Sequence, residues 1–424
     1  MGIHWRWPDV LTLGFAVLAL ASCSHVDASE AGGTAVDFET VWLRRVAAFN
    51  QTHQNNGTDI AVVSLDSILE TAQYLFAAPT SLNESFHTAP ELQDDTFWEA
   101  VGITRQLAGL NTTEVAASDV ESLLDSLTAK VAKLPNELCW PVLRRFIAAA
   151  LLQWRRRHGP YSAAAQAAIV RLCSQLFSVH KRAAGRKGVI DFFHVSKAGG
   201  TTFCQLAKLN GCRTQSFAAR RNCLVREFDD VPRWVNNSLH VSLAPEGLRT
   251  PWFANWGKPR NSVSCRIRKR FLLRRRYNIF ANEFTLYGGF RFPRNTHVCP
   301  GHLNVLQLRH PQTRLRSHLM WVWALYDHTF KEQASAFFPT RGSEHWQALM
   351  PAVLHNYYIR SLLGEAVYYL PAENLTQAHL AAARLAMTQF DVVVLLQRNQ
   401  LDLELYRFGS LLTLLDSVVF DLAR

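Results

Sequence analysis

Residues suited to binding a phosphate lie together at positions 196–202, which read Ser-Lys-Ala-Gly-Gly-Thr-Thr and follow an apolar run. Two adjacent glycines let a backbone approach a ligand closely. A strand followed by a loop and a helix would direct free N–H groups and the positive end of the helix dipole at that ligand. Lys197 precedes the glycines, whereas the lysine follows them in the GxxxxGK[ST] loop of nucleoside triphosphatases. The segment therefore predicts a phosphate-binding loop of another kind.

A second group suited to a phosphate lies in Leu-Arg-His-Pro-Gln-Thr-Arg-Leu-Arg-Ser-His, positions 308–318. Arg309 ends an apolar run, and Pro311 suits the first turn of a helix. Ser317 comes just under two helical turns later, so it can face the same side as Arg309. A guanidinium and a hydroxyl together would clamp one phosphate.

Together the two motifs resemble those of the PAPS-dependent Golgi carbohydrate sulfotransferases, especially the branch with the uronosyl 2-O- and glucosamine 6-O-sulfotransferases. The resemblance covers roughly residues 188–400, about half of the chain. Ser-Lys-Ala stands where Pro-Lys-Thr is more usual, and Arg-His-Pro stands where Arg-Asp-Pro is common. Both changes leave the predicted contacting groups in place.

The resemblance implies PAPS as the co-substrate, no metal, and transfer of its sulfuryl group to a hydroxyl of an anionic or neutral glycan. Lys197 would meet the bridging oxygen and stabilise charge on the leaving group. Arg309 and Ser317 would bind the 3′-phosphate. The 5′-phosphate would be held by the residues that follow the lysine: Ala198, Gly199, Gly200, Thr201 and Thr202.

The acceptor hydroxyl needs a base, which in this family is a glutamate or a histidine. Glu283, at the end of an apolar run, is the predicted base, and a surface or salt-bridged glutamate is the plain alternative. His297 and His302 are the other candidates. His194 lies within a strand by its pattern and is predicted to be a core histidine.

Short apolar runs alternate with helical stretches from position 186 onward. The predicted strands are 189–195, 277–283, 303–309 and 390–396, and the predicted helices are 201–210, 311–328, 345–364 and 376–389. This alternation is typical of an α/β fold with a P-loop-like, doubly wound and mostly parallel sheet. Ligands of such sheets bind beyond the carboxyl ends of the strands. The residues 196–202, Glu283 and Arg309 all lie at such strand ends.

The preceding region, 25–185, is predicted to be a helical N-terminal domain or stem, with a small and polar linker at 25–35 and a helical pattern over 37–182. Its helices are 118–134, where Ser118 and Glu121 form a capping-box pattern, 141–157 and 162–182. Residues 186–424 would form the sulfotransferase domain.

Residues 1–24 read as a secretory signal, with an apolar run at 10–21 that is shorter than the roughly 20 residues of a membrane span. A cleaved signal, an uncleaved type II anchor over 8–22 and a bacterial lipoprotein signal are the alternatives. The first two place the chain in the secretory pathway, with the Golgi lumen as the expected compartment. The sequence makes no prediction of oligomeric state.

Seven cysteines follow Cys23, and none forms a CxxC pair, which argues against a zinc ribbon or a thioredoxin-like site. In an oxidising lumen most should be paired. Cys139 could pair with Cys173, and Cys212 with Cys223. Cys204 is predicted to remain unpaired.

The net charge of +11 favours anionic partners. Seven of the eleven residues at 266–276 are basic. This stretch is predicted to be either a helix that faces a glycan or the nucleotide, or a helix with a solvated basic face. The N-terminal signal argues against a nuclear localisation sequence, and no nucleic-acid partner is predicted. Arg360 is a further candidate for binding a phosphate or the acceptor.

A set of aromatic and basic residues at 234–260 predicts either a sugar-stacking lip or core packing: Trp234, Trp252, Trp256, Arg249, Lys258 and Arg260. The alternative to a sulfotransferase is a catalytically inactive lumenal glycan- or nucleotide-binding protein on the same fold. A lumenal P-loop kinase is disfavoured because GK[ST] and a clear Mg²⁺-binding aspartate are missing.

Overall fold

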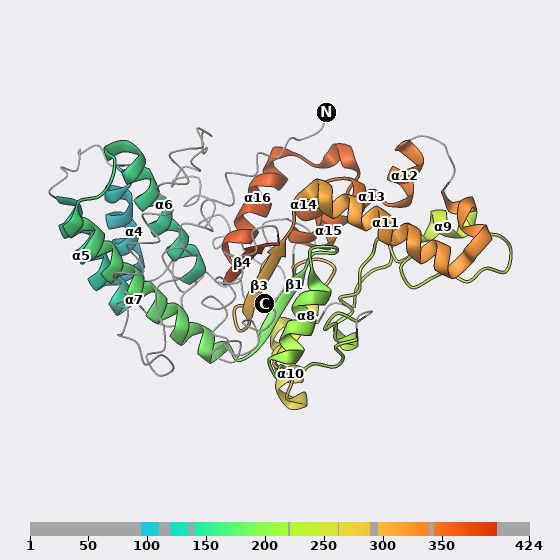
Figure 1. The fold of residues 1–424 in the computed structure, drawn as a ribbon, viewed down its shortest axis with the longest axis horizontal. Helices are drawn as coiled ribbons and strands as arrows, with labels where there is room; N and C mark the ends of the chain where they lie inside the picture. The colour runs from blue at the N-terminus through green and yellow to red at the C-terminus, as the bar shows by residue number, and fades with distance from the viewer. Residues whose placement is uncertain are drawn as a thin grey trace, which may run out of the picture. The chain divides into compact units, whose positions relative to one another are not determined.

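The computed structural model describes residues 95–109, 119–134, 140–218, 221–261, 263–288, 296–338 and 343–396. These residues fall into two compact units, a helical unit that ends at Arg186 and an α/β unit that begins at Lys187 (Figure 1). Within the described ranges, no helix is both long and apolar enough to cross a membrane. The predicted signal at 1–24 lies outside them.

The helical unit contains α4 (Asp95–Leu107), α5 (Val120–Lys133), α6 (Trp140–His158) and α7 (Ala163–Lys187). The predicted helices at 118–134, 141–157 and 162–182 are present, and α7 continues to the start of the α/β unit. Amphipathic spacing explains them, because α5 buries Leu124, Leu127 and Val131 on one face. The Glu121 carboxylate accepts a hydrogen bond from Ser162, and Ser118 lies outside the described residues.

The sheet of the α/β unit consists of β1 (Ile190–His194), β2 (Ile279–Asn282), β3 (Leu303–Leu308) and β4 (Val392–Leu395). All pairs are parallel, and the order is β2-β1-β3-β4. The strands β1, β2 and β3 are almost wholly buried, as expected of near-continuous apolar runs in a parallel sheet. The predicted α/β fold is therefore confirmed, and all four strands lie where the sequence predicted them.

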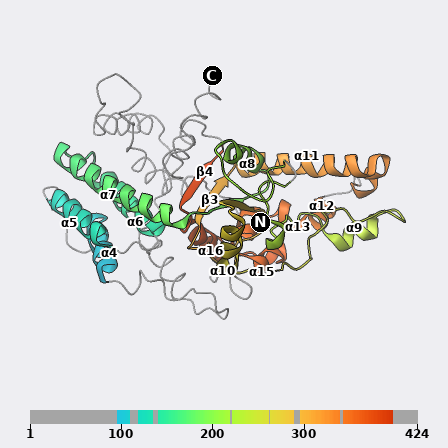
Figure 2. The same cartoon turned by 90° about the horizontal axis from the view of Figure 1, so that it is seen from below.

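Helices cover both faces of this sheet (Figure 2). On one face, Phe203 of α8 (Gly200–Leu209) stacks on Phe192 of β1, with ring centroids 3.9 Å apart. On the other, Leu272 of α10 (Cys265–Arg275) packs with Phe280 of β2. Phe192 and Phe280 point to opposite faces because Phe192 pairs with Ala281, the next residue along β2.

After β3 the chain forms α11 (Pro311–Phe330), η5 (Lys331–Phe337), α12 (Ser343–Leu349), α13 (Pro351–Leu354) and α14 (Tyr357–Leu362). The single helix predicted over 345–364 is therefore wrong. Pro351 begins a new helix, and Asn356 interrupts the chain again with a left-handed φ of 53°. The elements α15 (Glu365–Tyr368), η6 (Ala372–Asn374) and α16 (Gln377–Thr388) lead to β4. Two further elements, η3 (Arg226–Phe228) and α9 (Asn237–Leu243), precede α10.

Two disulfides occur in the α/β unit, Cys204–Cys223 and Cys265–Cys299. The predictions that Cys204 is unpaired and that Cys212 pairs with Cys223 are therefore wrong, because the segment before β2 brings Cys223 against α8. Cys212 is a half-buried thiol. Cys139 lies outside the described residues, so its pairing with Cys173 stays a prediction. Disulfides are typical of oxidising compartments.

The basic helix α10 is partly structural and partly solvated. Arg268 is buried, and its guanidinium donates to both carboxylate oxygens of Asp230, at 2.5 and 3.0 Å. The other arginines of 266–276 are exposed. Asp230 also pairs with Arg260 at 3.3 Å.

The predicted sugar-stacking lip does not form as a set. Trp234 is buried and Arg260 is held by Asp230, so these two residues belong to the core, whereas Trp252 is half exposed. Arg360 is also structural. Its guanidinium donates to four backbone carbonyls, those of His355, Val367, Tyr368 and Leu370.

Candidate functional site

The predicted phosphate loop connects the carboxyl end of β1 to the first turn of α8. Lys197 has a left-handed φ of 68°, which is uncommon for a residue with a side chain, and Gly199 has φ 94° as the N-cap of α8. The helix therefore begins with its backbone N–H groups directed at the loop. Thr201 and Thr202 lie exposed in this first turn, and the Thr201 hydroxyl donates to Asn222 at 2.9 Å.

The two glycines of the loop are required by packing within the protein. A Cβ on Gly199 would lie 2.2 Å from the amide nitrogen of Gln307, and the same amide donates to the Ala198 carbonyl at 2.6 Å. A Cβ on Gly200 would lie 2.0 Å from Nε2 of His194. The sequence pattern predicts close approach to a ligand, but these contacts within the protein already favour glycine at both positions.

Arg309 follows β3, the neighbour of β1, so the register places it beside the loop. Its guanidinium donates to the Lys197 carbonyl at 3.3 Å. The Tyr358 hydroxyl accepts from the Arg309 backbone N–H at 3.0 Å and donates to its carbonyl. The arginine backbone is thus fixed from α14 while its side chain reaches the loop.

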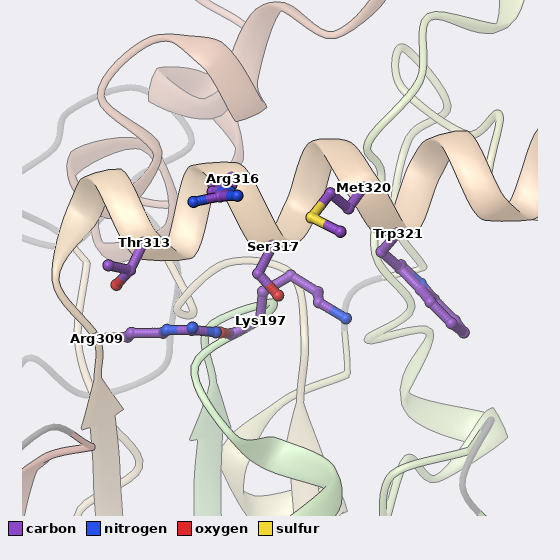
Figure 3. Close-up of a pocket in the computed structure, with 7 residues that line it drawn as sticks. All are labelled: Lys197, Arg309, Thr313, Arg316, Ser317, Met320 and Trp321. Atoms are coloured by element: carbon purple, nitrogen blue, oxygen red, sulfur yellow. The ribbon is translucent and has the colours of Figure 1, made fainter.

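A pocket of about 520 Å³ opens beside these residues (Figure 3). Its lining combines the predicted Lys197, Arg309 and Ser317 with four residues of α11 that the sequence analysis did not select: Thr313, Arg316, Met320 and Trp321. The volume is within the usual range of small-molecule sites. Three cations and no carboxylate line the pocket, which favours an anionic ligand.

The four additional residues follow a pattern visible in the sequence. One face of α11 carries these four residues and Ser317, because their positions recur at helical spacing: 313, 316, 317, 320 and 321. Arg309 lies just before the start of this helix. A search of 311–328 for residues on the face of Ser317 would have found them.

The Lys197 ammonium lies over the indole of Trp321, 4.6 Å from the ring centroid. Burial lowers the pKa of Lys197, the Glu283 carboxylate raises it, and Arg309 lowers it further. The lysine is therefore held among opposing charges and is exposed enough to reach a ligand in the pocket.

Glu283 directly follows β2, at the carboxyl end of the strand beside β1. Its side chain is only 6% exposed, so it is not a surface glutamate. A carboxylate oxygen of Glu283 lies 3.4 Å from Nδ1 of His194. His194 is buried, as predicted. Glu283 is not among the residues that line the pocket, although its charge acts on Lys197.

The two alternative histidines occupy different surroundings. His302 precedes β3 at the amino ends of the strands, where its Nδ1 lies 3.5 Å from a carboxylate oxygen of Asp191. This is the opposite edge of the sheet from the loop, so His302 cannot reach a ligand held there. The His297 ring contacts the Val298 carbonyl at 3.0 Å, and its backbone pairs with Tyr287.

The loop rests on a layer of buried, hydrogen-bonded side chains. The Ser196 hydroxyl accepts from the Trp234 indole N–H at 2.9 Å and contacts the Tyr357 hydroxyl at 2.8 Å. Nδ1 of His318 lies 2.9 Å from the Arg314 guanidinium. Burial, with help from Arg314 and Lys197, lowers the pKa of His318 well below its usual value, so this histidine is neutral.

One cluster of possible metal ligands occurs in the described parts of the chain, formed by Asp191, Cys299 and His302. Cys299 is bonded to Cys265, so it offers no thiolate in this state. The cluster also lies at the amino ends of the strands, away from the pocket.

No protein-family model, curated protein or solved structure matches the chain. Its function therefore has to be inferred from the chemistry of the site.

Proposed function

We propose that the protein is a PAPS-dependent sulfotransferase that transfers a sulfuryl group to a hydroxyl of a carbohydrate. The observation that carries this proposal is the meeting of Lys197, Arg309 and Ser317 on one pocket. These residues lie up to 120 positions apart in sequence and come from two separate motifs, both predicted to contact the same nucleotide.

The donor carries two phosphate-containing ends, and the site offers a binding group for each. The first turn of α8 presents backbone N–H groups, Thr201 and Thr202 to the 5′-phosphosulfate. Arg309 and Ser317 bind the 3′-phosphate by charge-assisted hydrogen bonds. No covalent intermediate with the protein is needed, because positioning of the reactants and stabilisation of the developing charge account for most of the catalysis of sulfuryl transfer.

The transfer step forms one bond to sulfur and breaks another, with a residue for each charge or proton that moves. The acceptor oxygen forms a bond to sulfur while the bond from sulfur to the bridging oxygen of the 5′-phosphate breaks. Lys197 stabilises the charge that collects on that oxygen. Glu283 takes the acceptor proton, and Nδ1 of His194 lies 3.4 Å from its carboxylate. The products are the sulfated sugar and 3′-phosphoadenosine 5′-phosphate (PAP).

A transfer assay with the full-length chain tests the proposal. Sulfur-labelled PAPS is incubated with desulfated heparin, desulfated chondroitin and a neutral lactosamine polymer, and label in the polysaccharide is measured. Transfer to at least one acceptor, lost in Lys197→Ala and kept in the exposed-lysine control Lys208→Ala, is expected. Binding of PAP without transfer to any glycan would favour the inactive nucleotide-binding alternative. Absence of PAP binding would refute both.

A further inference from the structure

Trp321 forms an unusual part of the pocket. Every polar group nearby is suited to an anion, yet the Trp321 side chain brings a large aromatic face that is 38% exposed. Met320, beside it, is 64% exposed. Monomeric proteins expose single apolar residues routinely, but an indole facing a cationic pocket offers a specific binding surface.

The position of Trp321 separates it from the predicted nucleotide contacts. It lies one helical turn beyond Ser317 on the same face of α11. In Figure 3, Arg309 and Ser317 lie on one side of the Lys197 ammonium, and Trp321 lies on the other. If Lys197 contacts the bridging oxygen, as the proposed function requires, Trp321 is beside the sulfuryl end of the donor, where the acceptor must enter.

The Lys197 ammonium covers the indole in this structure, at 4.6 Å from its centroid. A cation–π contact at a partly exposed site is weaker than a charge-assisted bond to a phosphate or sulfate oxygen. An arriving donor therefore draws the ammonium away from the ring. The face that it leaves is electron-rich and flat, which suits the C–H groups of a pyranose ring.

We infer that Trp321 is a stacking residue for the acceptor sugar and that Lys197 shields it until the donor binds. This inference rests on the proposed function and adds to it a subsite for a pyranose and an order of binding, donor before acceptor.

The first test compares Trp321→Leu, Trp321→Phe and Trp323→Leu in the full-length chain. Trp323 is the matched control, because it is 48% exposed, packs on Phe338 and points about 200° away around the helix. With the best acceptor of the panel, Trp321→Leu raises the acceptor KM about tenfold, Trp321→Phe restores part of the loss, and Trp323→Leu has little effect. PAP affinity, measured by calorimetry, stays within about twofold in all three.

An unchanged acceptor KM in Trp321→Leu would overturn the inference and leave the proposed function intact. A parallel loss of PAP affinity would do the same, since the indole would then serve the adenine. A wild-type chain that transfers sulfate to no glycan would overturn the proposed function, and this inference with it.

The second test addresses the shielding. A fluorescently end-labelled sample of the same polysaccharide is titrated by anisotropy with and without PAP. PAP raises its affinity about tenfold in the wild type, which is an ordinary coupling between sites. In Lys197→Ala the indole is always uncovered, so the ratio of the two affinities falls to about one. The ratio of the affinities with and without PAP is the readout, because loss of the lysine charge weakens polysaccharide binding in both titrations. A ratio in Lys197→Ala equal to that of the wild type would overturn the shielding role.

Discussion

Replacing Gly200 with alanine should destabilise the α/β unit, although glycine-to-alanine changes in helices usually stabilise. The new Cβ would lie 2.0, 2.1 and 2.3 Å from Nε2, Cδ2 and Cε1 of His194. The imidazole cannot easily yield, because it is 4% exposed, stacks near Phe192 at 5.6 Å and contacts Glu283. Overpacking of this kind costs about 1–3 kcal/mol, and the better helix propensity of alanine returns at most about 1 kcal/mol.

The expected net loss for Gly200→Ala is about 1–2 kcal/mol, or about 2–8 °C in the melting temperature of a unit of this size. Scanning calorimetry measures it. Gly102, in the interior of α4 in the helical unit, has no atom within 4 Å of a built Cβ. It is the control for helix propensity, and Gly102→Ala should gain about 0.5–1 kcal/mol.

A double-mutant cycle isolates the cause. In a His194→Ala background the ring is gone, so Gly200→Ala should lose its penalty. An equal penalty in both backgrounds, or a Gly200→Ala variant as stable as the wild type, would refute the packing argument.

Three further predictions concern the proposed reaction. Lys197→Ala should abolish transfer and leave PAP binding largely intact by calorimetry, because the ammonium meets the bridging oxygen; near-normal turnover would contradict the assignment of the loop. Arg309→Ala should weaken PAP binding about tenfold to a hundredfold, the value of a charged hydrogen bond, and Ser317→Ala less; wild-type affinity in both would exclude the clamp. Glu283→Gln should lower turnover about 10²–10⁴-fold with PAP affinity unchanged, and an active, folded variant would point to another base.

The strands were predictable because each is a short apolar run that parallel pairing buries on both faces. The loop and the arginine followed from the same logic, since residues after parallel strands gather at one edge. Glu283 also followed from it, and its position one residue past the register pair Phe193–Asn282 brings it beside His194. Local sequence therefore predicted the four strands and the residues that follow them.

Features that depend on non-local packing were missed. The pairing of Cys204 with Cys223 depends on how the segment before β2 folds back, and Leu224 bridges Ala281 there. For Trp234 the sequence left a sugar-stacking lip and core packing open, and the buried hydrogen bond from its indole N–H to the Ser196 hydroxyl decides for the core. The helix predicted over 345–364 had the right spacing, but Asn356 adopts a left-handed backbone that spacing does not reveal.

The link between the Arg309 guanidinium and the Lys197 carbonyl joins residues 112 positions apart, and it has a consequence for how the protein matures. During synthesis β1 and the loop leave the ribosome long before β3 does. The strand order places β1 between β2 and β3, so its second neighbour arrives last of the three. Contacts of such long sequence separation form slowly, because loop closure must precede them. The pocket therefore forms late in folding. A chain stalled or cut before α11 would carry the complete predicted phosphate loop without Arg316, Ser317 and Trp321, which line the pocket.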